Sequence, residues 1–315
     1  MTKKTDESRR SALRMLGALG CGGLALANQR SASAVVTPNA AVAGRQNASL
    51  DLSTPEKRSE TIVKIMGSTV AEATHAFMRF HVYGFTGTNA VPFFSMNNYL
   101  IQYWEPVKHG TYDMRHYEVG YFTKFDSDEP ITHWDNPITG ETVEMEQFVL
   151  GPVRRSYTPS GIVAPGIAPE PLSINVIGDR VFIPAQSIES FPSMFPPSEW
   201  PEISNQEKVY WDSFYTYSAS LAEVLDDDTP GPRAEIHMQN LTSWQPFLRL
   251  GRTPGRLMVR AFGTHVPGFE VLSPDVRKGF EQYTPQIFDT ESWTTTLFDN
   301  VEYFKKMTMH RDSEK

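Results

Sequence analysis

The sequence is poor in cysteine, in positive charge and in long apolar runs. Its 315 residues contain one cysteine, which excludes a disulfide framework and a metal site built from several thiolates. The formal net charge of −8 argues against a basic nucleic-acid-binding surface, so no nucleic-acid partner is predicted. No run of 18 apolar residues is present to span a membrane. With 40% hydrophobic and 12% aromatic residues, the composition is that of a globular protein with a large core.

Familiar catalytic motifs are missing as well. The sequence has no phosphate-binding loop, nucleophile elbow, zinc-protease helix or EF-hand loop. A Ser-His-Asp site assembled from distant positions stays open. The acidic run Asp226–Asp228 precedes Thr229-Pro230-Gly231, and a solvated turn explains this run better than a calcium site does. We therefore predict no cofactor and no metal.

The N-terminus has the pattern of a twin-arginine export leader. Paired arginines lie within Ser8–Arg14, an apolar run extends from Met15 to Ala27, and Ala32–Ala34 offers a small-residue cleavage site. We expect a signal peptide over residues 1–34, recognition by the twin-arginine export machinery, and a periplasmic or secreted mature protein. A lipoprotein cleavage site at Cys21 is the alternative, although alanine stands three residues before it, where leucine is usual.

Loss of this leader would change the composition of the mature chain. The leader holds six Lys and Arg against two Asp and Glu, so its removal changes the net charge from −8 to −12. Cys21 leaves with it, and a cysteine-free chain suits an oxidising compartment.

A polar stretch over residues 35–52 predicts a disordered spacer before the folded part. Ser53-Thr54-Pro55-Glu56 is a capping box with proline in the first turn, and it predicts a helix that ends at Gly67. Period-two alternation follows. Strands are predicted over residues 76–83, 93–104, 112–125, 142–150, 174–177, 181–188 and 257–264, and helices over Ser273–Tyr283 and Ser292–Met307.

The predicted strands follow one another through turns, with no helix of crossover length between them. This order favours an antiparallel meander over a doubly wound parallel sheet. Several strands carry large apolar or aromatic side chains on both faces, which a sheet closed or nearly closed into a barrel explains. We expect a mainly β, lipocalin-like single domain over residues 53–315, with flanking N- and C-terminal helices.

Three segments in the middle of the chain carry a family resemblance. They are Tyr121–Asp126, Trp134–Glu141 and Gly151–Val153. Together they resemble the signature of domain of unknown function 1838, with Trp-x-Asn-Pro-x-Thr-Gly-Glu as the most specific part. The resemblance covers the chain from about Gly67 to Tyr283. It implies a single β-rich domain in an exported bacterial protein, and it carries over no reaction. The Asn-Pro and Gly of the second segment predict a hairpin.

Polar side chains in apolar strands are the best candidates for chemistry. Arg79, His81 and Tyr83 share one face of a predicted strand, and His116 and Glu118 share one face of another. Burying such groups is costly unless each finds a partner. We expect a barrel interior in which the two histidines act as acid and base. Glu118 would orient them, while Arg79 and Tyr83 would hold an oxyanion.

Two other interpretations of these residues stay open. In the first, Arg79 and Glu118 form a structural ion pair and the histidines lie on a solvated outer face. In the second, His81, His116 and Glu118 make a two-histidine, one-carboxylate metal site, although their spacing is common by chance.

Aromatic side chains in or near the strands are the candidate ligand-binding set. Its members are Trp104, Tyr121, Trp134, Trp211, Tyr215 and Tyr217. Such rings line pockets for small hydrophobic or aromatic molecules, and they also build ordinary cores. Residues 211–217 fit either a strand or a helix. Aromatic outer faces fit either packed helices or a homo-oligomer interface.

Two functions from different classes follow. The first is a cofactor-independent lyase, isomerase or hydrolase that acts by acid–base chemistry on a small hydrophobic or aromatic metabolite. The second is an exported β-barrel protein that binds a hydrophobic small molecule without catalysis. We favour the enzyme, because a simple carrier has little use for buried His, Glu and Arg together. Acid–base groups within ~3 Å of one another and facing a cavity would support it.

Overall fold

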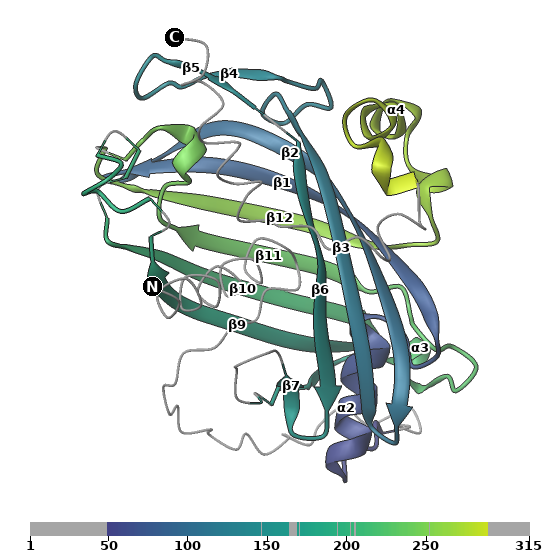
Figure 1. The fold of residues 1–315 in the computed structure, drawn as a ribbon. Helices are drawn as coiled ribbons and strands as arrows, with labels where there is room; N and C mark the ends of the chain where they lie inside the picture. The colour runs from purple at the N-terminus through teal and green to yellow at the C-terminus, as the bar shows by residue number, and fades with distance from the viewer. Residues whose placement is uncertain are drawn as a thin grey trace, which may run out of the picture.

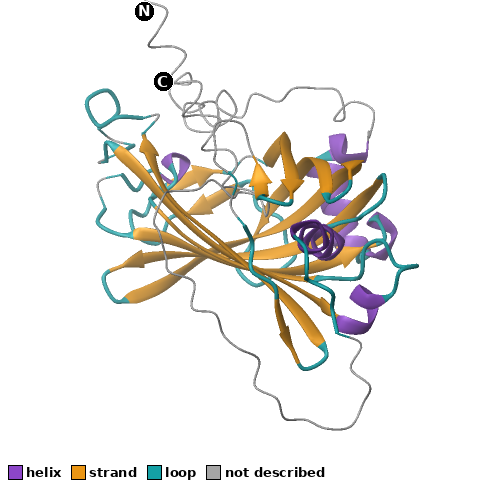
Figure 2. Cartoon of the chain, turned by 90° about the horizontal axis from the view of Figure 1, so that it is seen from below, coloured by secondary structure: helices purple, strands orange, loops and turns teal. Residues whose placement is uncertain are grey.

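The computed structural model describes residues 49–288, apart from residues 146, 164–168, 170, 194, 202, 205 and 252. The predicted signal peptide, most of the predicted spacer and the predicted helix Ser292–Met307 lie outside these residues. Within them, strands dominate, and the main sheet curls into a half-barrel (Figures 1 and 2). The elements are α2 (Pro55–Met66), β1 (Glu72–Thr86), β2 (Asn89–Lys108), β3 (Thr111–Thr123), β4 (His133–Asp135), β5 (Thr142–Glu144), β6 (Phe148–Thr158), β7 (Gly161–Val163), β8 (Asn175–Ile177), β9 (Arg180–Pro192), β10 (Lys208–Ser220), α3 (Leu221–Leu225), β11 (Glu235–Thr242), η1 (Pro246–Leu248), β12 (Arg256–Val266), η2 (Phe269–Val271), α4 (Pro274–Tyr283) and η3 (Pro285–Phe288).

The main sheet has ten strands in the order β7-β6-β3-β2-β1-β12-β11-β10-β9-β8, and its pairings are antiparallel. Two meanders therefore form two wings, one from β1 to β7 and the other from β8 to β12. The pairing of β1 with β12 joins them. This confirms the predicted mainly β, antiparallel, lipocalin-like fold in the form of an open half-barrel.

Alternation along β1 defines the two faces of the sheet. Ala76, Met78, Phe80 and Val82 are buried in the larger core, together with residues from both wings. We call this side the inner face. The intervening residues of β1 lie on the outer face, where a smaller core forms around Phe280 of α4.

The predicted first helix is confirmed as α2. The Thr54 side chain accepts a hydrogen bond from the backbone N–H of Lys57 at 3.3 Å, and the helix ends at Gly67. A Cβ on Gly67 would lie 2.0 Å from the ring of Trp104. Glycine at this position therefore lets Trp104 pack directly against the end of the helix.

The predicted hairpin is confirmed as β4–β5. Asn136 Oδ1 accepts hydrogen bonds from the backbone N–H groups of Ile138 and Thr139, and Gly140 has φ +74°. The Asn136 Nδ2 group donates to the carbonyl of Leu248 at 3.2 Å. Trp134 packs on Phe93 with ring centroids 4.7 Å apart, so the hairpin covers part of the larger core.

The predicted strand over residues 142–150 is wrong as a single element. The structure has β5 and β6 there, because β5 returns to β4 in the small sheet whereas β6 joins β3 in the main sheet. Residues 211–217 form part of strand β10.

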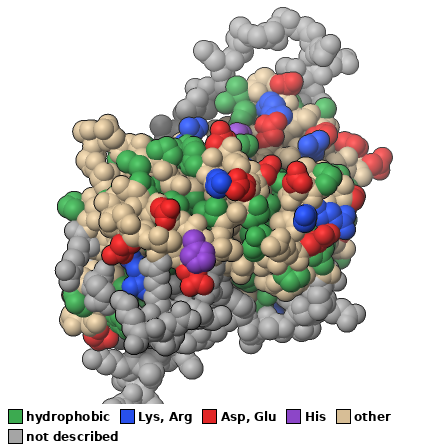
Figure 3. All heavy atoms as spheres, turned by 90° about the horizontal axis from the view of Figure 1, so that it is seen from above, with side chains coloured by type: hydrophobic (Ala, Val, Ile, Leu, Met, Phe, Trp, Pro, Cys, Tyr) green, Lys and Arg blue, Asp and Glu red, His purple; other side chains and the backbone are tan. Residues whose placement is uncertain are grey.

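Seen from above, exposed hydrophobic side chains lie among charged ones on the surface of the protein (Figure 3). Among the described residues, no helix has the length and apolar character needed to cross a membrane.

Candidate functional site

The two faces of the sheet separate the side chains that were expected to form one catalytic group. Glu118 lies opposite Leu100, and Leu100 lies opposite Ala76, so Glu118 and His116 share the inner face. Arg79, His81 and Tyr83 lie on the outer face of β1. The structure therefore does not bring these five residues into one site. It presents two candidate sites, one on each face.

We call the inner-face site the inner cluster, consisting of Asn98, His116 and Glu118. These residues are 0%, 1% and 0% exposed. The Asn98 Nδ2 group donates a hydrogen bond to one carboxylate oxygen of Glu118. The other carboxylate oxygen lies 3.2 Å from His116 Nε2. The carboxylate thus joins an amide from β2 to an imidazole from β3.

Two buried acceptor atoms of the inner cluster are left without partners. The Glu118 carboxylate offers only acceptor atoms, to Asn98 and to His116 alike. Its contact with His116 Nε2 therefore assigns the imidazole proton to that nitrogen. In the neutral imidazole, His116 Nδ1 then carries a lone pair, and neither this atom nor Asn98 Oδ1 has a hydrogen-bond partner among the described residues. Buried polar atoms are normally paired, so two unpaired acceptors in one hydrogen-bond network call for a donor from a ligand or a water.

A β-bulge in β6 lies opposite the inner cluster. His116 pairs with Val153 and Glu118 with Leu150, so β6 has one extra residue in this interval. Gly151 has φ +121°, and a Cβ there would lie 2.6 Å from the carbonyl oxygen of His116. The bulge therefore depends on glycine, and it comes from the third segment of the family resemblance.

Arg155 and Tyr157 of β6 add a cation and a phenol to the inner face. Arg155 is 5% exposed and lies opposite Met114, two residues from His116 along β3. Burial raises the pKa of Tyr157, while the charge of Arg155 and its hydrogen bond to the phenol act against that shift. The ring of Tyr157 lies 4.9 Å from that of Trp104.

The predicted ligand-binding aromatics are distributed over three places. Trp104, Trp211, Tyr215 and Tyr217 are buried on the inner face, and Trp134 covers one part of the same core. Tyr121 lies on the outer face beneath α4, where burial raises its pKa to about 12. Four of the six residues therefore share a face with the inner cluster.

The Arg79 guanidinium forms an ion pair and hydrogen bonds on the outer face. It pairs with Asp128, and it also donates to the carbonyl of Ser127 and to Asn97 Oδ1. Asn97 in turn donates to the Tyr121 hydroxyl at 2.8 Å. The ion pair of Arg79 is thus with Asp128 and not with Glu118. This network links β1, β2 and β3 to a turn.

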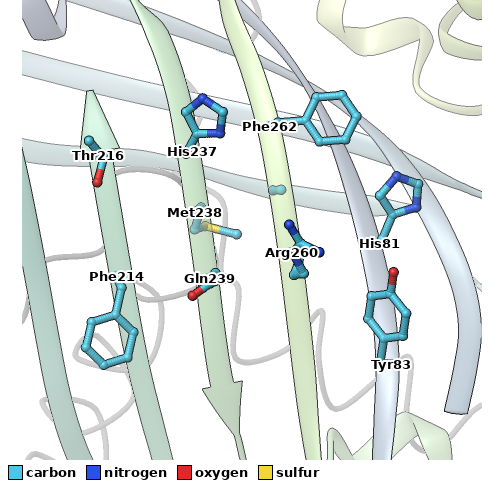
Figure 4. Close-up of a pocket in the computed structure, with 10 residues that line it drawn as sticks. His81, Tyr83, Phe214, Thr216, His237, Met238, Gln239, Arg260 and Phe262 are labelled. Carbon is cyan, nitrogen blue, oxygen red and sulfur yellow. The ribbon is translucent and has the colours of Figure 1, made fainter. Parts of the chain in front are cut away.

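The outer-face site is a groove with a volume of about 390 Å³, which we call the outer groove (Figure 4). It lies across β10, β11, β12 and β1. Its lining residues are His81, Tyr83, Phe214, Thr216, His237, Met238, Gln239, Arg260, Ala261 and Phe262.

His81 is held in place at one side of the outer groove. Its Nδ1 atom lies 3.0 Å from Ser95 Oγ, and its ring stacks on Phe262 with centroids 5.8 Å apart. Burial lowers the pKa of His81, the charges of Arg79 and Arg260 lower it further, and Asp126 acts in the opposite direction. The imidazole is therefore a neutral group at neutral pH.

Several residues of both sites were not identified as candidates from the sequence. Asn98 and Arg155 are buried polar residues on the inner faces of their strands. Their signal is a polar residue at a position where the alternation requires an apolar one. Arg260 and His237 lie at exposed positions, where charged and polar residues are ordinary, so the sequence gives no signal for them.

The remaining acidic candidates behave as turn residues. The two carboxylate oxygens of Asp226 accept hydrogen bonds from the backbone of Asp228 and from the Thr229 hydroxyl. Across the described part of the chain, no group of three or more His, Cys, Asp or Glu side chains is placed to hold a metal ion.

Comparison with known proteins places the chain in a family. No curated protein matches it. The family profile described as "Protein of unknown function (DUF1838)" matches residues 81–308, which include the inner cluster, the β6 bulge and the outer groove. This match covers well over half of the sequence and agrees with the resemblance of the three central segments. The chain belongs to the DUF1838 family.

Proposed function

We propose that this protein is an exported, cofactor-independent enzyme, a lyase, isomerase or hydrolase, and that His116 is its catalytic base. Its substrate is a small hydrophobic or aromatic molecule that carries a hydrogen-bond donor, such as a phenol, an enol or an alcohol. The observation that carries the proposal is the inner cluster, in which a carboxylate orients an imidazole whose second nitrogen is buried and has no partner among the described residues.

Each member of the inner cluster has a role in this proposal. Glu118 holds the imidazole with its proton on Nε2, so His116 Nδ1 is free to accept a proton from the substrate. Asn98 Oδ1 accepts a second hydrogen bond from the same molecule, which fixes its orientation. Asn98 Nδ2 holds Glu118 in place.

The surroundings supply charge and apolar contact. Arg155 lies opposite Met114, two residues from His116 along β3, and it stabilises the anion that proton removal leaves. Tyr215 and Tyr217 of β10 lie on the inner face of the opposite wing and contribute the aromatic surface for the rest of the substrate. Export rests on the twin-arginine pattern of residues 1–34.

The proposed tautomer gives the first test. In protein labelled with ¹⁵N-histidine, we expect the NMR signals of His116 to show a proton on Nε2 and a bare Nδ1 nitrogen. Glu118→Gln should remove this fixed pattern. A proton found on Nδ1 would overturn the assignment of His116 as the base.

Turnover gives the second test. A library of small phenols, alcohols and enolisable ketones is incubated with the wild-type protein and with His116→Gln. The matched control is His133→Gln, which changes an exposed histidine of β4. We expect loss of turnover in the first variant and wild-type turnover in the control. Equal turnover in all three proteins would rule out the mechanism.

Binding without catalysis is the second candidate function. It is favoured by the burial of His116 and Glu118, which are at most 1% exposed. Native mass spectrometry of the protein from its exporting cell separates the two functions. An organic mass retained by both wild type and His116→Gln, with no product formed, supports the binding protein. The same spectrum tests export, because cleavage after Ala34 leaves a chain that begins at Val35.

A further inference from the structure

The outer face is covered unevenly. Helix α4 packs over β1, β2 and β3, where Phe280 contacts the rings of Phe77, Tyr99 and Tyr121. Across the other wing, large apolar side chains remain exposed, including Phe214 at 40% and Phe262 at 51%. These two rings line the outer groove.

Hydrogen-bond donors converge on the outer groove. Ser95 is buried, and its Oγ accepts a hydrogen bond from the backbone N–H of Asp126 at 2.9 Å. In the tautomer that has its N–H on Nε2, the Ser95 hydroxyl donates to His81 Nδ1 and the Nε2 N–H is left for a ligand. The Tyr83 hydroxyl points toward His81 in the close-up (Figure 4).

The charge of the outer groove is positive. Arg260 projects from its middle, and no carboxylate among the described residues forms an ion pair with it. No Asp or Glu is among the described residues that line the outer groove. A guanidinium without an ion-pair partner among the described residues, beside neutral donors, is the arrangement that binds a carboxylate.

The apolar walls define the rest of the ligand. Phe262 and His81 lie to one side of Arg260, and Phe214 lies to the other (Figure 4). A volume of about 390 Å³ is at the small end of ligand sites and accommodates a molecule of one or two rings. Exposed rings flanking a cation favour a flat aromatic molecule with an acidic group.

We propose that the outer groove is a binding site for a small aromatic carboxylate. Arg260 pairs with the carboxylate, the His81 N–H donates a second hydrogen bond, and the ligand's rings lie between Phe262 and Phe214. This site is on the face opposite the inner cluster and does not depend on the function proposed for that cluster.

The test uses a matched pair of probes in isothermal titration. 2-Naphthoate carries the carboxylate, and 2-naphthalenemethanol is a neutral molecule of similar size. We expect the wild-type protein to bind the naphthoate about tenfold or more tightly than the alcohol, as expected for a charge-assisted hydrogen bond. Arg260→Ala should abolish this preference, and Phe262→Ala should weaken the binding of both probes several-fold.

Arg233→Ala is the matched control, because Arg233 is exposed and lies outside the groove. It should bind both probes as the wild type does. Equal binding of the two probes by the wild type, or equal effects of Arg260→Ala and Arg233→Ala, would overturn the proposal. No detectable binding of either probe to the wild type would overturn it as well.

Discussion

At the scale of single residues, Glu118 is the group on which the inner cluster depends. Its carboxylate is 0% exposed and accepts hydrogen bonds from Asn98 and His116. A buried carboxylate is stable only with such partners, and its donors in turn need the carboxylate. The same geometry that suits proton transfer therefore also contributes to stability.

Glu118→Ala is expected to lower the free energy of unfolding by about 3 kcal/mol, because it leaves two buried donors without an acceptor and opens a cavity. Urea unfolding followed by circular dichroism measures the change. The control is Glu105→Ala, since Glu105 is an exposed residue of the same sheet and its loss should change stability by at most about 0.5 kcal/mol. Similar values for the two variants would contradict the buried network.

The sequence showed which candidate residues share a face of one strand, but not how the strands bring them together. Period two correctly placed His116 with Glu118, and Arg79 with His81 and Tyr83. It could not show that the two sets lie on opposite faces, because that depends on the register between β1, β2 and β3. Hydrogen-bond partners such as Asn98 are separated in sequence and become visible only once the strands are paired.

At the scale of elements, local chemistry predicted most of the fold. The capping box marked α2, the Asn-Pro and Gly turn marked the β4–β5 hairpin, and alternation marked β1, with further strands predicted at β2 and β3. Strand β11 was not predicted, because most of its outer residues are polar and its inner face includes Asn240 and Thr242. The bulge in β6 could not be predicted, since a bulge is defined by the partner strand.

Gly151→Ala tests the dependence of this bulge on glycine. A Cβ would lie 2.6 Å from the carbonyl oxygen of His116, at a φ of +121° that disfavours any side chain. We expect a loss of about 3 kcal/mol in the free energy of unfolding, together with a shift of the His116 NMR signals.

Gly140→Ala is the matched control for that variant. Gly140 also has a positive φ, +74°, but nothing lies within 4 Å of its Cβ position. Only backbone strain of about 1 kcal/mol is expected there. If the two variants lose the same stability, crowding against His116 does not set the requirement for glycine at position 151.

At the scale of the whole molecule, three histidines connect stability to pH. Burial lowers the pKa of His75, with Glu270 acting against it, and burial also lowers the pKa of His265 despite its hydrogen bonds to backbone carbonyls. His81 shifts in the same direction because of burial and two nearby arginines. The described fold thus holds these three imidazoles in their neutral form.

The direction of the pH effect follows from the order of protonation. As the pH falls through the ordinary histidine pKa of 6.5, the unfolded chain takes up protons before the folded chain does. The contribution of these histidines is therefore fully present well above pH 6.5 and is lost as the pH falls below it. Each group contributes a slope of at most about 1.4 kcal/mol per pH unit. Thermal unfolding between pH 8 and pH 5 should show the melting temperature decreasing.

His265→Gln should make this decrease shallower, because it removes one group that the folded chain keeps neutral. His109→Gln, which changes an exposed histidine, should leave the slope as in the wild type. The comparison is made on the slope and not on the absolute melting temperature, since a glutamine at position 265 also alters packing and the hydrogen bond to Pro232. An unchanged slope in His265→Gln would mean that this imidazole is protonated equally in the folded and unfolded chains, so that its burial does not control the acid sensitivity of the half-barrel.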